Sequence, residues 1–336
     1  MDCQIPIILC IDVEPDGFFI ERDRPLPWKG YERAFEYFSK LRQLSAAISE
    51  SPTHFSWFYR MDPQVAETYG TPDWAIKNYP TYVEDFLKKG DEMGLHPHAY
   101  RWVKTDNDWL VDHADQEWVD HCVEMSFAAY KNVFGRTCDS FRFGASWIND
   151  ATLRLVEKLG ARFDLTLEPE YVNDWSYEGY RRYRGSYLDY ECVPRMPYRP
   201  SHDDLRRPDP ERKEGIWMIP TSTGKITYRY GRTERLLRRI FKPSDLKPRR
   251  ITLNLAYGPN RFRIITEELL RCLERPYFAF VMRTDALSSP QQMKNVEACF
   301  DILLNHPRAR QFVFSTPAEA LRILGCLEPA KALAAL

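Results

Sequence analysis

Two carboxylates follow directly on the first apolar run of the chain, Ile5–Ile11. We predict that this run is a buried strand, and strand alternation then places Asp12 and Glu14 on the same side of its C-terminal end. Two carboxylates that share a small site repel each other, so a cation must lie between or beside them. The plain alternative is a polar turn after the strand, capped by Asp16.

Two histidines, His96 and His98, stand at the end of another apolar run, Met93–His98. Strand alternation points both imidazoles the same way, and imidazole together with carboxylate suits a divalent metal. Taken alone, this spacing also occurs with structural or incidental histidines. Because both pairs stand at the ends of predicted strands, we predict that Glu14, His96 and His98 bind a metal and leave one position open for water. Asp12 then remains as the base that deprotonates this water.

A third charged group, Arg142, emerges at the C-terminal end of the predicted strand Ser140–Phe143. An arginine at this place can make a two-nitrogen contact with Asp12, which orients the carboxylate and keeps it ionised. A surface salt bridge is the alternative explanation for this arginine.

Strands and helices alternate along the chain, and this order defines the scaffold that must position these residues. Apolar, β-rich runs predict strands at Ile5–Ile11, His54–Tyr59, Met93–His98, Ser140–Phe143, Arg162–Thr166, Ile216–Thr221, Ile251–Tyr257, Phe278–Arg283 and Gln311–Ser315. Helical patterns predict helices at Tyr31–Ile48, Thr81–Lys89, Gln116–Val133, Asn149–Leu159, Thr266–Leu273 and Gln292–Leu304. The alternation predicts an α/β fold with a mostly parallel sheet and helices on both faces, and the number of repeats favours a barrel. Barrels place their active sites at the C-terminal ends of the strands.

The composition argues against several classes of protein. The 336 residues include 47 Lys and Arg against 48 Asp and Glu, a net charge of -1, so a broad nucleic-acid-binding surface is not expected. No run of about 18 apolar residues occurs, so no membrane span is expected. The absence of a GxGxxG motif after the first strand and of a Walker A motif argues against a nucleotide-binding doubly wound fold. The 8 cysteines are scattered and none forms a CxxC pair, which indicates reduced thiols and a cytoplasmic location.

One long stretch, from about residue 168 to residue 214, interrupts the alternation of strands and helices. It is rich in Tyr, Arg, Asp and Pro and is too long for an ordinary connection. Because it begins just after the fifth predicted strand, we predict a lid over the C-terminal face of the barrel that shapes the substrate pocket. Its Tyr198, Arg199 and His202 suit a sugar that bears a phosphate or a carboxylate. The alternative is a lid that only stabilises the barrel.

Taken together, these segments resemble the polysaccharide deacetylase superfamily, also called the NodB-homology or carbohydrate esterase family 4 group. The resemblance runs over roughly residues 5–325. The stretch Ile8–Glu14 resembles its first motif, Gly90–His96 its second, and Phe141–Gly144 with Trp147 its third. The stretch Pro194–Ser201 is similar to a branch of the superfamily found in bacterial surface-polysaccharide and lipopolysaccharide loci.

This resemblance implies a distorted (β/α)7 barrel with an irregular insertion, a divalent metal that is usually zinc, and hydrolysis of an N-acetyl group on a sugar. The expected partner is an N-acylated sugar of a polysaccharide or glycan precursor. Trp147, in the third motif, joins Tyr198, Arg199 and His202 as a predicted substrate-binding residue. Residues 1–326 are predicted to form this single domain, followed by a tail at 327–336; the oligomeric state is not predicted.

The chain departs from the family pattern at three places. Val13 separates two carboxylates that are usually adjacent aspartates, so Glu14 takes the metal role, and Tyr100 stands where the second histidine is usually found. Arg283 or Asp285 stands in place of the late histidine that serves as general acid, and we predict both as catalytic residues. An arginine cannot exchange a proton near neutral pH, but it can stabilise an oxyanion.

Three functions therefore stay open at this stage. The leading prediction is a metal-dependent amide hydrolase that acts on an N-acylated sugar. The alternatives are a catalytically altered or inactive barrel that binds glycan, and a non-hydrolytic sugar-processing enzyme on the same scaffold. His202 is a further candidate for the missing proton donor.

Overall fold

The computed structural model describes residues 4–17, 20–170, 183–226 and 249–328. Within these ranges no helix combines the length and the apolar character needed to cross a membrane. The predicted tail at 327–336 lies almost wholly outside the described residues.

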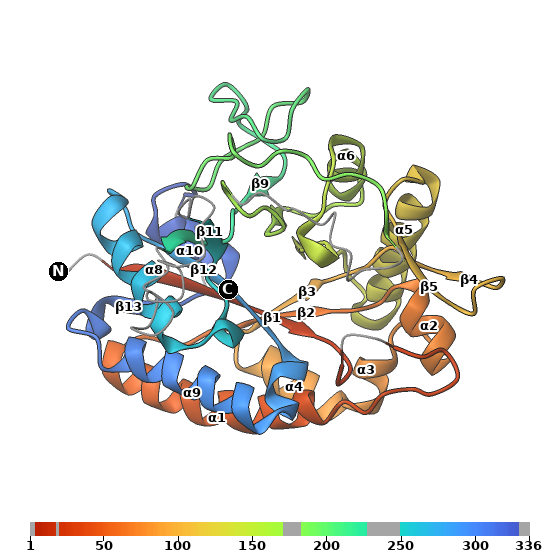
Figure 1. Cartoon of the computed structure of the whole chain (residues 1–336). Coiled ribbons are helices and arrows are strands. Elements are labelled where there is room, and N and C mark those ends of the chain that lie inside the picture. Colours follow the sequence, from red (N-terminus) through yellow and green to blue (C-terminus); the bar gives the residue numbers. More distant parts are fainter. Residues whose placement is uncertain (1–3, 18–19, 171–182, 227–248, 329–336) are drawn as a thin grey trace, which may run out of the picture.

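A parallel sheet of eight strands forms the centre of the molecule, and its longest strand, β1 (Ile5–Val13), pairs with three others (Figure 1). The strand order is β12-β1-β2-β3-β6-β7-β9, and β13 also pairs with β1. The other strands are β2 (Ser56–Tyr59), β3 (Glu92–Leu95), β6 (Ser140–Phe141), β7 (Phe163–Asp164), β9 (Trp217–Met218), β12 (Phe278–Arg283) and β13 (Phe312–Phe314).

The sheet curls until its two outer strands approach each other. Ser222, which follows β9, donates its backbone N–H to the carbonyl of Ala279 in β12 at 2.6 Å. Leu253 bridges the same gap, because its N–H donates to Ser222 and its carbonyl accepts from Val281. The predicted α/β barrel is therefore confirmed, and it is distorted where these short backbone bridges replace a continuous strand pair.

Helices cover the outside of the sheet, with α1 and α9 side by side along one face (Figure 1). The helix α1 turns apolar residues inward at helical spacing, among them Tyr31, Phe38 and Leu41. The helices are α1 (Lys29–Ser49), α2 (Pro63–Tyr69), α3 (Trp74–Asn78), α4 (Pro80–Lys88), α5 (Gln116–Phe134), α6 (Asp150–Lys158), α8 (Pro259–Cys272), α9 (Pro290–Leu304) and α10 (Pro317–Ile323).

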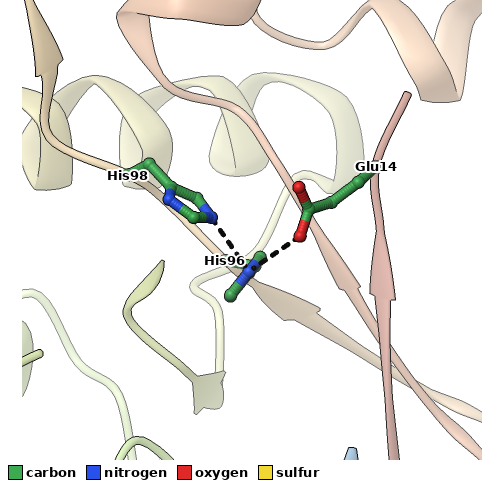
Figure 2. Close-up of side chains that lie close together, drawn as sticks. All are labelled: Glu14, His96 and His98. Atoms are coloured by element: carbon green, nitrogen blue, oxygen red, sulfur yellow. Dashed lines mark hydrogen bonds and ion pairs between the residues drawn. The ribbon is translucent and has the colours of Figure 1, made fainter. Parts of the chain in front are cut away.

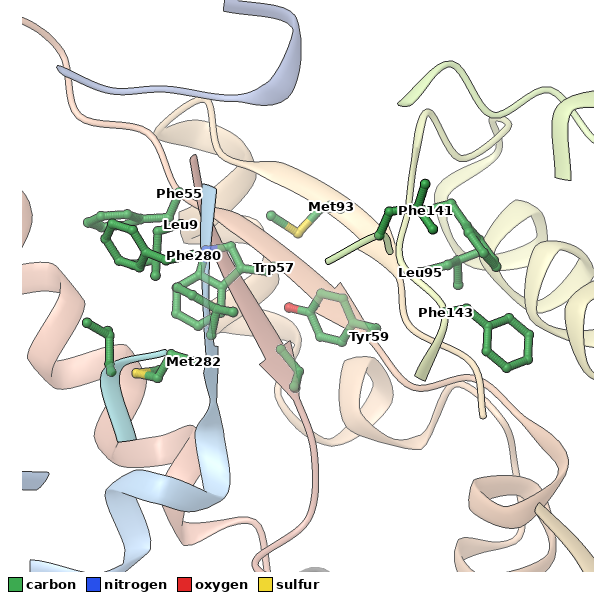
Figure 3. Close-up of a cluster of buried hydrophobic side chains, with 14 of the residues drawn as sticks. Leu9, Phe55, Trp57, Tyr59, Met93, Leu95, Phe141, Phe143, Phe280 and Met282 are labelled. Carbon is green, nitrogen blue, oxygen red and sulfur yellow. The ribbon is translucent and has the colours of Figure 1, made fainter. Parts of the chain in front are cut away.

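The strand β1 alternates between two apolar layers, and this alternation sets the direction of the residues that follow. Leu9 belongs to the large cluster between sheet and helices, where Trp57 and Phe280 also pack (Figure 3). Ile8 and Cys10 belong to a smaller cluster with residues of β7, β12 and α10. Polar side chains that continue the row of Ile8 and Cys10 therefore point into the barrel at its C-terminal end.

The predicted strand Ile251–Tyr257 has different bounds in the structure. The strand β11 (Arg249–Thr252) starts two residues earlier, pairs antiparallel with β10 (Thr223–Ile226) and is followed by a 3-10 helix at Leu255–Tyr257. The Asn254 side chain accepts a hydrogen bond from the backbone N–H of Ala256, which ends the extended conformation and starts this turn.

A second small sheet stands beside the C-terminal ends of the barrel strands. The hairpin of β4 (Tyr100–Val103) and β5 (Asp108–Asp112) follows β3, and β5 pairs in parallel with β8 (Tyr183–Arg184). No sequence pattern predicted this hairpin.

The irregular segment predicted as a lid divides into two parts, and residues 171–182 lie outside the described residues. The part that starts at β8 packs beside the turn after β6, where Tyr187 donates a hydrogen bond to the carbonyl of Ala145. The part after residue 197 runs along β9, where Tyr198 and Met218 exchange backbone hydrogen bonds, and it also contacts α6 (Figure 1). The first part is thus placed by its contacts beside the turn after β6, and the second part beside β9 and the start of α6.

Candidate active site

The strands β1, β3 and β6, which belong to one parallel sheet, bring five of the predicted site residues together at their C-terminal ends. Asp12 belongs to β1 and Glu14 follows it; His96 and His98 follow β3, and Arg142 follows β6. All five side chains are buried, with 2–9% of their surface exposed. Parallel strands end at the same edge of a sheet, so residues distant in sequence meet here.

The three predicted metal ligands form one compact cluster (Figure 2). The Nε2 atom of His96 lies 3.4 Å from Oε1 of Glu14 and 3.2 Å from Nε2 of His98. All three ligand atoms lie within 4.8 Å of one another. Two ligands of one tetrahedral zinc ion are about 3.4 Å apart, because each lies about 2.1 Å from the metal. The donor set and its spacing therefore fit a single divalent cation.

The outer contacts of the histidines prepare both rings for this role. The carbonyl oxygen of Arg142 lies 2.9 Å from Nδ1 of His96, so Nδ1 is the protonated nitrogen and Nε2 has its lone pair free. The His98 ring stacks on Tyr100 with ring centroids 5.4 Å apart. Burial, and then the charge of Arg60, hold the pKa of His98 well below its ordinary value, so His98 is neutral.

Glu14 is held as an ionised carboxylate. Burial opposes its ionisation, but the Arg283 guanidinium and the two histidines outweigh burial and hold the pKa of Glu14 well below its ordinary value. Its Oε2 atom lies 3.3 Å from Nη2 of Arg283 and 3.8 Å from Nη1 of Arg60. Both guanidinium groups lie on the side of Oε2, so Oε1 faces Nε2 of His96.

Asp12 and Arg142 are in contact, as the sequence predicted, but not through two nitrogens. Nε of Arg142 lies 3.3 Å from Oδ1 and 3.4 Å from Oδ2 of Asp12. The contact with Asp12 is made by Nε, while Nη1 donates to the carbonyl of Leu165 at 2.7 Å. Oδ1 of Asp12 is buried and accepts no hydrogen bond within the described structure, while Oδ2 lies 3.6 Å from Nε2 of His96. A carboxylate that can still accept a hydrogen bond thus lies beside the cluster of Glu14, His96 and His98.

Arg283 and Asp285 lie on the far side of Glu14. Nη2 of Arg283 is 3.0 Å from Oδ2 of Asp285 and also contacts Glu14, so one guanidinium bridges two carboxylates. Burial raises the pKa of Asp285 to about 6, and Arg283 only partly offsets this. The geometry gives Arg283 a role in holding Glu14; a direct catalytic role for either residue stays a prediction.

The predicted substrate-binding residues are engaged elsewhere. Trp147 is buried, stacks on His113 at 4.3 Å and donates its indole N–H to the carbonyl of Ser186. Its ring is covered by protein, so a sugar cannot stack on it without a rearrangement.

Tyr198, Arg199 and His202 all lie in the part of the irregular segment that runs along β9. The Tyr198 hydroxyl donates to the carbonyl of Leu205, and the Arg199 guanidinium lies 4.6 Å above the ring of Trp217. His202 is exposed, and the contact described for it is that of its carbonyl with Arg154 on α6. The structure does not bring these three residues to the metal cluster, and a role in substrate binding stays a prediction.

Two residues of the site were missed by the sequence analysis. Arg60 binds Asp62 through two nitrogens, at 2.8 and 2.9 Å, and both side chains are buried. Asp62 in turn accepts a hydrogen bond from the backbone N–H of His98 at 3.0 Å and caps α2. The signal was present, because two charged residues so close to the end of the apolar run His54–Tyr59 indicate a polar site.

Gly144 is the last residue of the stretch that resembles the third motif, and the structure shows why a glycine stands there. A Cβ atom on Gly144 would lie 2.3 Å from Cγ of His98, so only glycine allows the imidazole to pack against this turn. The next two residues, Ala145 and Ser146, have φ angles of 55° and 52°, a conformation that is uncommon for residues with a side chain.

Comparison with known proteins supports the fold. No family model matches the sequence, and no curated protein matches it significantly. A protein from Parabacteroides distasonis assigned as a glycoside hydrolase/deacetylase is 14% identical with a TM-score of 0.59, over 96% of this chain and 73% of that chain. PuuE allantoinase is 12% identical with a TM-score of 0.52, over 97% of this chain and 92% of that chain.

The architecture shared with the first of these structures agrees with the resemblance seen in the sequence motifs. The structural similarity concerns the fold, in which a curled parallel sheet carries Asp12, Glu14, His96 and Arg142 at its strand ends in this chain. The chain therefore shares the fold of these two solved structures.

Proposed function

We propose that this protein is a metal-dependent hydrolase that removes an N-acyl group, most simply acetyl, from a sugar of a polysaccharide or glycan precursor. The observation that carries the proposal is the buried Glu14, His96 and His98 cluster with Asp12 at its edge. The names of the two structural neighbours, a deacetylase and an allantoinase, support a hydrolytic function. Zinc as the metal and the cytoplasm as the location are parts of this proposal.

Glu14, His96 and His98 would hold the metal. A divalent cation bound there supplies Lewis-acid polarisation of the acyl carbonyl and lowers the pKa of water at the site. This chain supplies one carboxylate and two neutral imidazoles to it, so the bound cation keeps a net positive charge, which hydrolysis of an amide requires.

Asp12 is the proton acceptor of the proposed reaction. Its Oδ1 accepts no hydrogen bond among the described residues, so it can accept a proton from the attacking water without losing one. Arg142 holds Asp12 beside the cluster, because its Nε lies 3.3 and 3.4 Å from the two carboxylate oxygens. The proton must finally reach the leaving amine, and Asp12, once protonated, can return it.

One observation favours a second candidate function. Arg283 occupies the position at which the resemblance leads us to expect a proton-donating histidine, and it is engaged with Glu14 and Asp285. A barrel that lacks this donor can bind an acylated glycan, or process its sugar without hydrolysis, and use the metal only to hold the ligand.

Acetate release from N-acetylated oligosaccharides separates the two candidates. The protein is stripped with a chelator, reloaded with Zn²⁺, and compared with the stripped form and with an O-acetylated substrate as control. We expect release only from the N-acetylated substrate and only after reloading. Metal binding and glycan binding without release would replace the proposed hydrolysis by the second candidate, and absence of metal binding would exclude both.

A further inference from the structure

We propose that Tyr190, which lies in the irregular segment after β8, is a positioning residue for the metal ligand His98. It acts through the turn formed by residues 144–148, which we call the 144–148 turn. This inference rests on the proposed metal site and adds a part of the molecule, the first half of the irregular segment, to the residues that hold it.

The 144–148 turn packs directly against His98. The Cα atom of Gly144 faces the imidazole so closely that an added Cβ would lie 2.3–2.4 Å from its Cγ, Cδ2 and Nδ1 atoms. The backbone N–H of Gly144 also donates to the carbonyl of Pro97, the residue before His98, at 2.8 Å. Any shift of the turn therefore changes the packing against the His98 ring and displaces the backbone of Pro97.

One hydrogen bond within the turn, from the backbone N–H of Trp147 to the carbonyl of Gly144 at 3.3 Å, supports its shape. Ala145 and Ser146 both have positive φ angles, 55° and 52°, and residues with a side chain leave this region unless surrounding contacts fix them. Two such residues in succession need hydrogen bonds from outside the turn.

The irregular segment supplies those hydrogen bonds. The Tyr190 hydroxyl donates to the carbonyl of Ser146 at 3.1 Å and accepts from the backbone N–H of Ile148 at 3.4 Å, so it spans the turn. The Tyr187 hydroxyl donates to the carbonyl of Ala145 at 3.1 Å. Tyr190 is completely buried, so water cannot take the place of its hydroxyl, whereas Tyr187 is only partly buried.

One further contact ties the turn to the barrel. Oγ of Ser146 donates to Oε1 of Glu168 at 2.7 Å, just beyond β7. This bond anchors the side chain of Ser146, but its carbonyl still depends on Tyr190. Removal of the Tyr190 hydroxyl therefore leaves a buried carbonyl and a buried N–H without partners in the turn.

The test compares Tyr190→Phe with Tyr198→Phe. The control removes a hydroxyl of the same kind, since Tyr198 is also buried and donates to a backbone carbonyl, that of Leu205, but it lies along β9. Zn²⁺ affinity is measured by competition with a chromophoric chelator, and the Co²⁺ absorption spectrum reports ligand geometry. We expect Tyr190→Phe to weaken metal binding about 10–100-fold and to change the Co²⁺ spectrum. Tyr198→Phe should stay within about twofold of the wild type, even where both variants lose similar thermal stability.

A rescue variant separates positioning from general loss of structure. Replacing Ala145 by Gly in the Tyr190→Phe protein lowers the cost of the positive φ angle and should restore part of the metal affinity. Equal losses in the Tyr190→Phe and Tyr198→Phe proteins, or unchanged affinity in Tyr190→Phe, would overturn the inference.

A metal-independent readout distinguishes this inference from the proposed function. The imidazole NMR resonances of His98 in the metal-free protein should shift in Tyr190→Phe and not in Tyr198→Phe. A wild type that binds no divalent metal would refute the metal site, and these resonances would then decide alone whether Tyr190 positions the ring: unshifted resonances would refute the inference as well.

Discussion

At the N-terminal end of the barrel, His54 and Glu319 form a pair of the same residue types as His96 and Glu14 at the C-terminal end. Nδ1 of His54 lies 2.9 and 2.8 Å from the two oxygens of Glu319, and the same carboxylate caps α10 through Thr316. The hydrogen bond that His54 donates to Glu319 raises the pKa of His54, whereas the pKa of His98 is lowered. The half-buried pair of His54 and Glu319 holds α10 to the barrel, whereas the buried imidazoles of His96 and His98 direct their Nε2 atoms toward one point.

Two aspartates show the same contrast. Asp91, just before β3, accepts hydrogen bonds from the backbone N–H of Phe55, the indole of Trp57 and the guanidinium of Arg42, at 2.6–2.9 Å. Asp12, at the other end of the sheet, keeps one buried oxygen without a donor. A carboxylate whose acceptor sites are filled stabilises the fold, and one with a vacant acceptor site is available for chemistry. We therefore infer a division between the two ends of the barrel: polar residues at the N-terminal end stabilise the fold, and those at the C-terminal end serve chemistry.

The largest effect is expected for Asp12→Asn. The amide is isosteric, so the fold should be retained, but it cannot accept a proton from water. We expect the rate of deacylation to fall by a factor of about 10²–10⁴, with a melting temperature close to that of the wild type. Steady-state kinetics on an N-acetylated oligosaccharide check this, and full activity in the variant would remove Asp12 from the reaction.

Asp91→Ala should have the reverse profile. It leaves the buried indole N–H of Trp57 and the Arg42 guanidinium without their acceptor, so the free energy of unfolding should fall by about 3 kcal/mol. Urea denaturation measures this, with the exposed Asp203→Ala as a control that changes stability by less than about 0.5 kcal/mol. Metal affinity should not change in either variant, and a loss of metal in Asp91→Ala would contradict the division.

Gly144→Ala tests the packing of the His98 ring. The new Cβ would lie 2.3 Å from Cγ of His98, so the imidazole must move, and metal affinity should fall about 10–100-fold. Gly70→Ala is the matched control: its added Cβ meets no atom within 4 Å, yet its φ of 87° makes alanine unfavourable there. The control should lose stability and keep its metal. Metal affinity that falls equally in both proteins would mean that general destabilisation, not the ring contact, is responsible.

The smallest effect concerns the pH dependence of the His54–Glu319 pair. Because the pKa of His54 is raised in the folded state, its contribution is complete below about pH 6.5 and is lost as the pH rises through the folded value. The pKa of Glu319 is lowered, so its contribution is lost as the pH falls below about 4.5. His54→Gln should therefore lower the free energy of unfolding by up to about 1 kcal/mol near pH 6 and by less at pH 9. A difference that grows toward pH 9 would show that the pair is not ionic.

Sequence patterns predicted the parts of this molecule that depend on short-range alternation. The directions of Asp12, Glu14 and His96 follow from strand period alone, and β12 was predicted with its observed ends, Phe278–Arg283. The N-terminal signals of α2 and α10 were also present, as Asp62 before a proline and as the capping box of Thr316 and Glu319, but both helices are short and were missed.

The remaining parts depend on contacts between distant segments. Arg60 contacts Glu14 because β1 and β2 are neighbours in the sheet. Arg142 donates a hydrogen bond to the carbonyl of Leu165 because β6 and β7 pair. The local sequence around these residues does not indicate which strands will be neighbours. For the same reason, the aromatic residues of the irregular segment gave no indication that Trp147 would be buried instead of facing a sugar.

The most direct test of the account is a metal titration of the wild type beside His98→Ala and His54→Ala. The first variant removes a histidine from the buried cluster with Glu14, and the second removes the histidine of the half-buried pair with Glu319, at opposite ends of the same barrel. We predict that the wild type and His54→Ala each bind one equivalent of Zn²⁺ and that His98→Ala loses this binding while it remains folded. A wild type without stoichiometric binding, or a His98→Ala protein with unchanged stoichiometry and affinity, would contradict the assignment of Glu14, His96 and His98 as the metal centre.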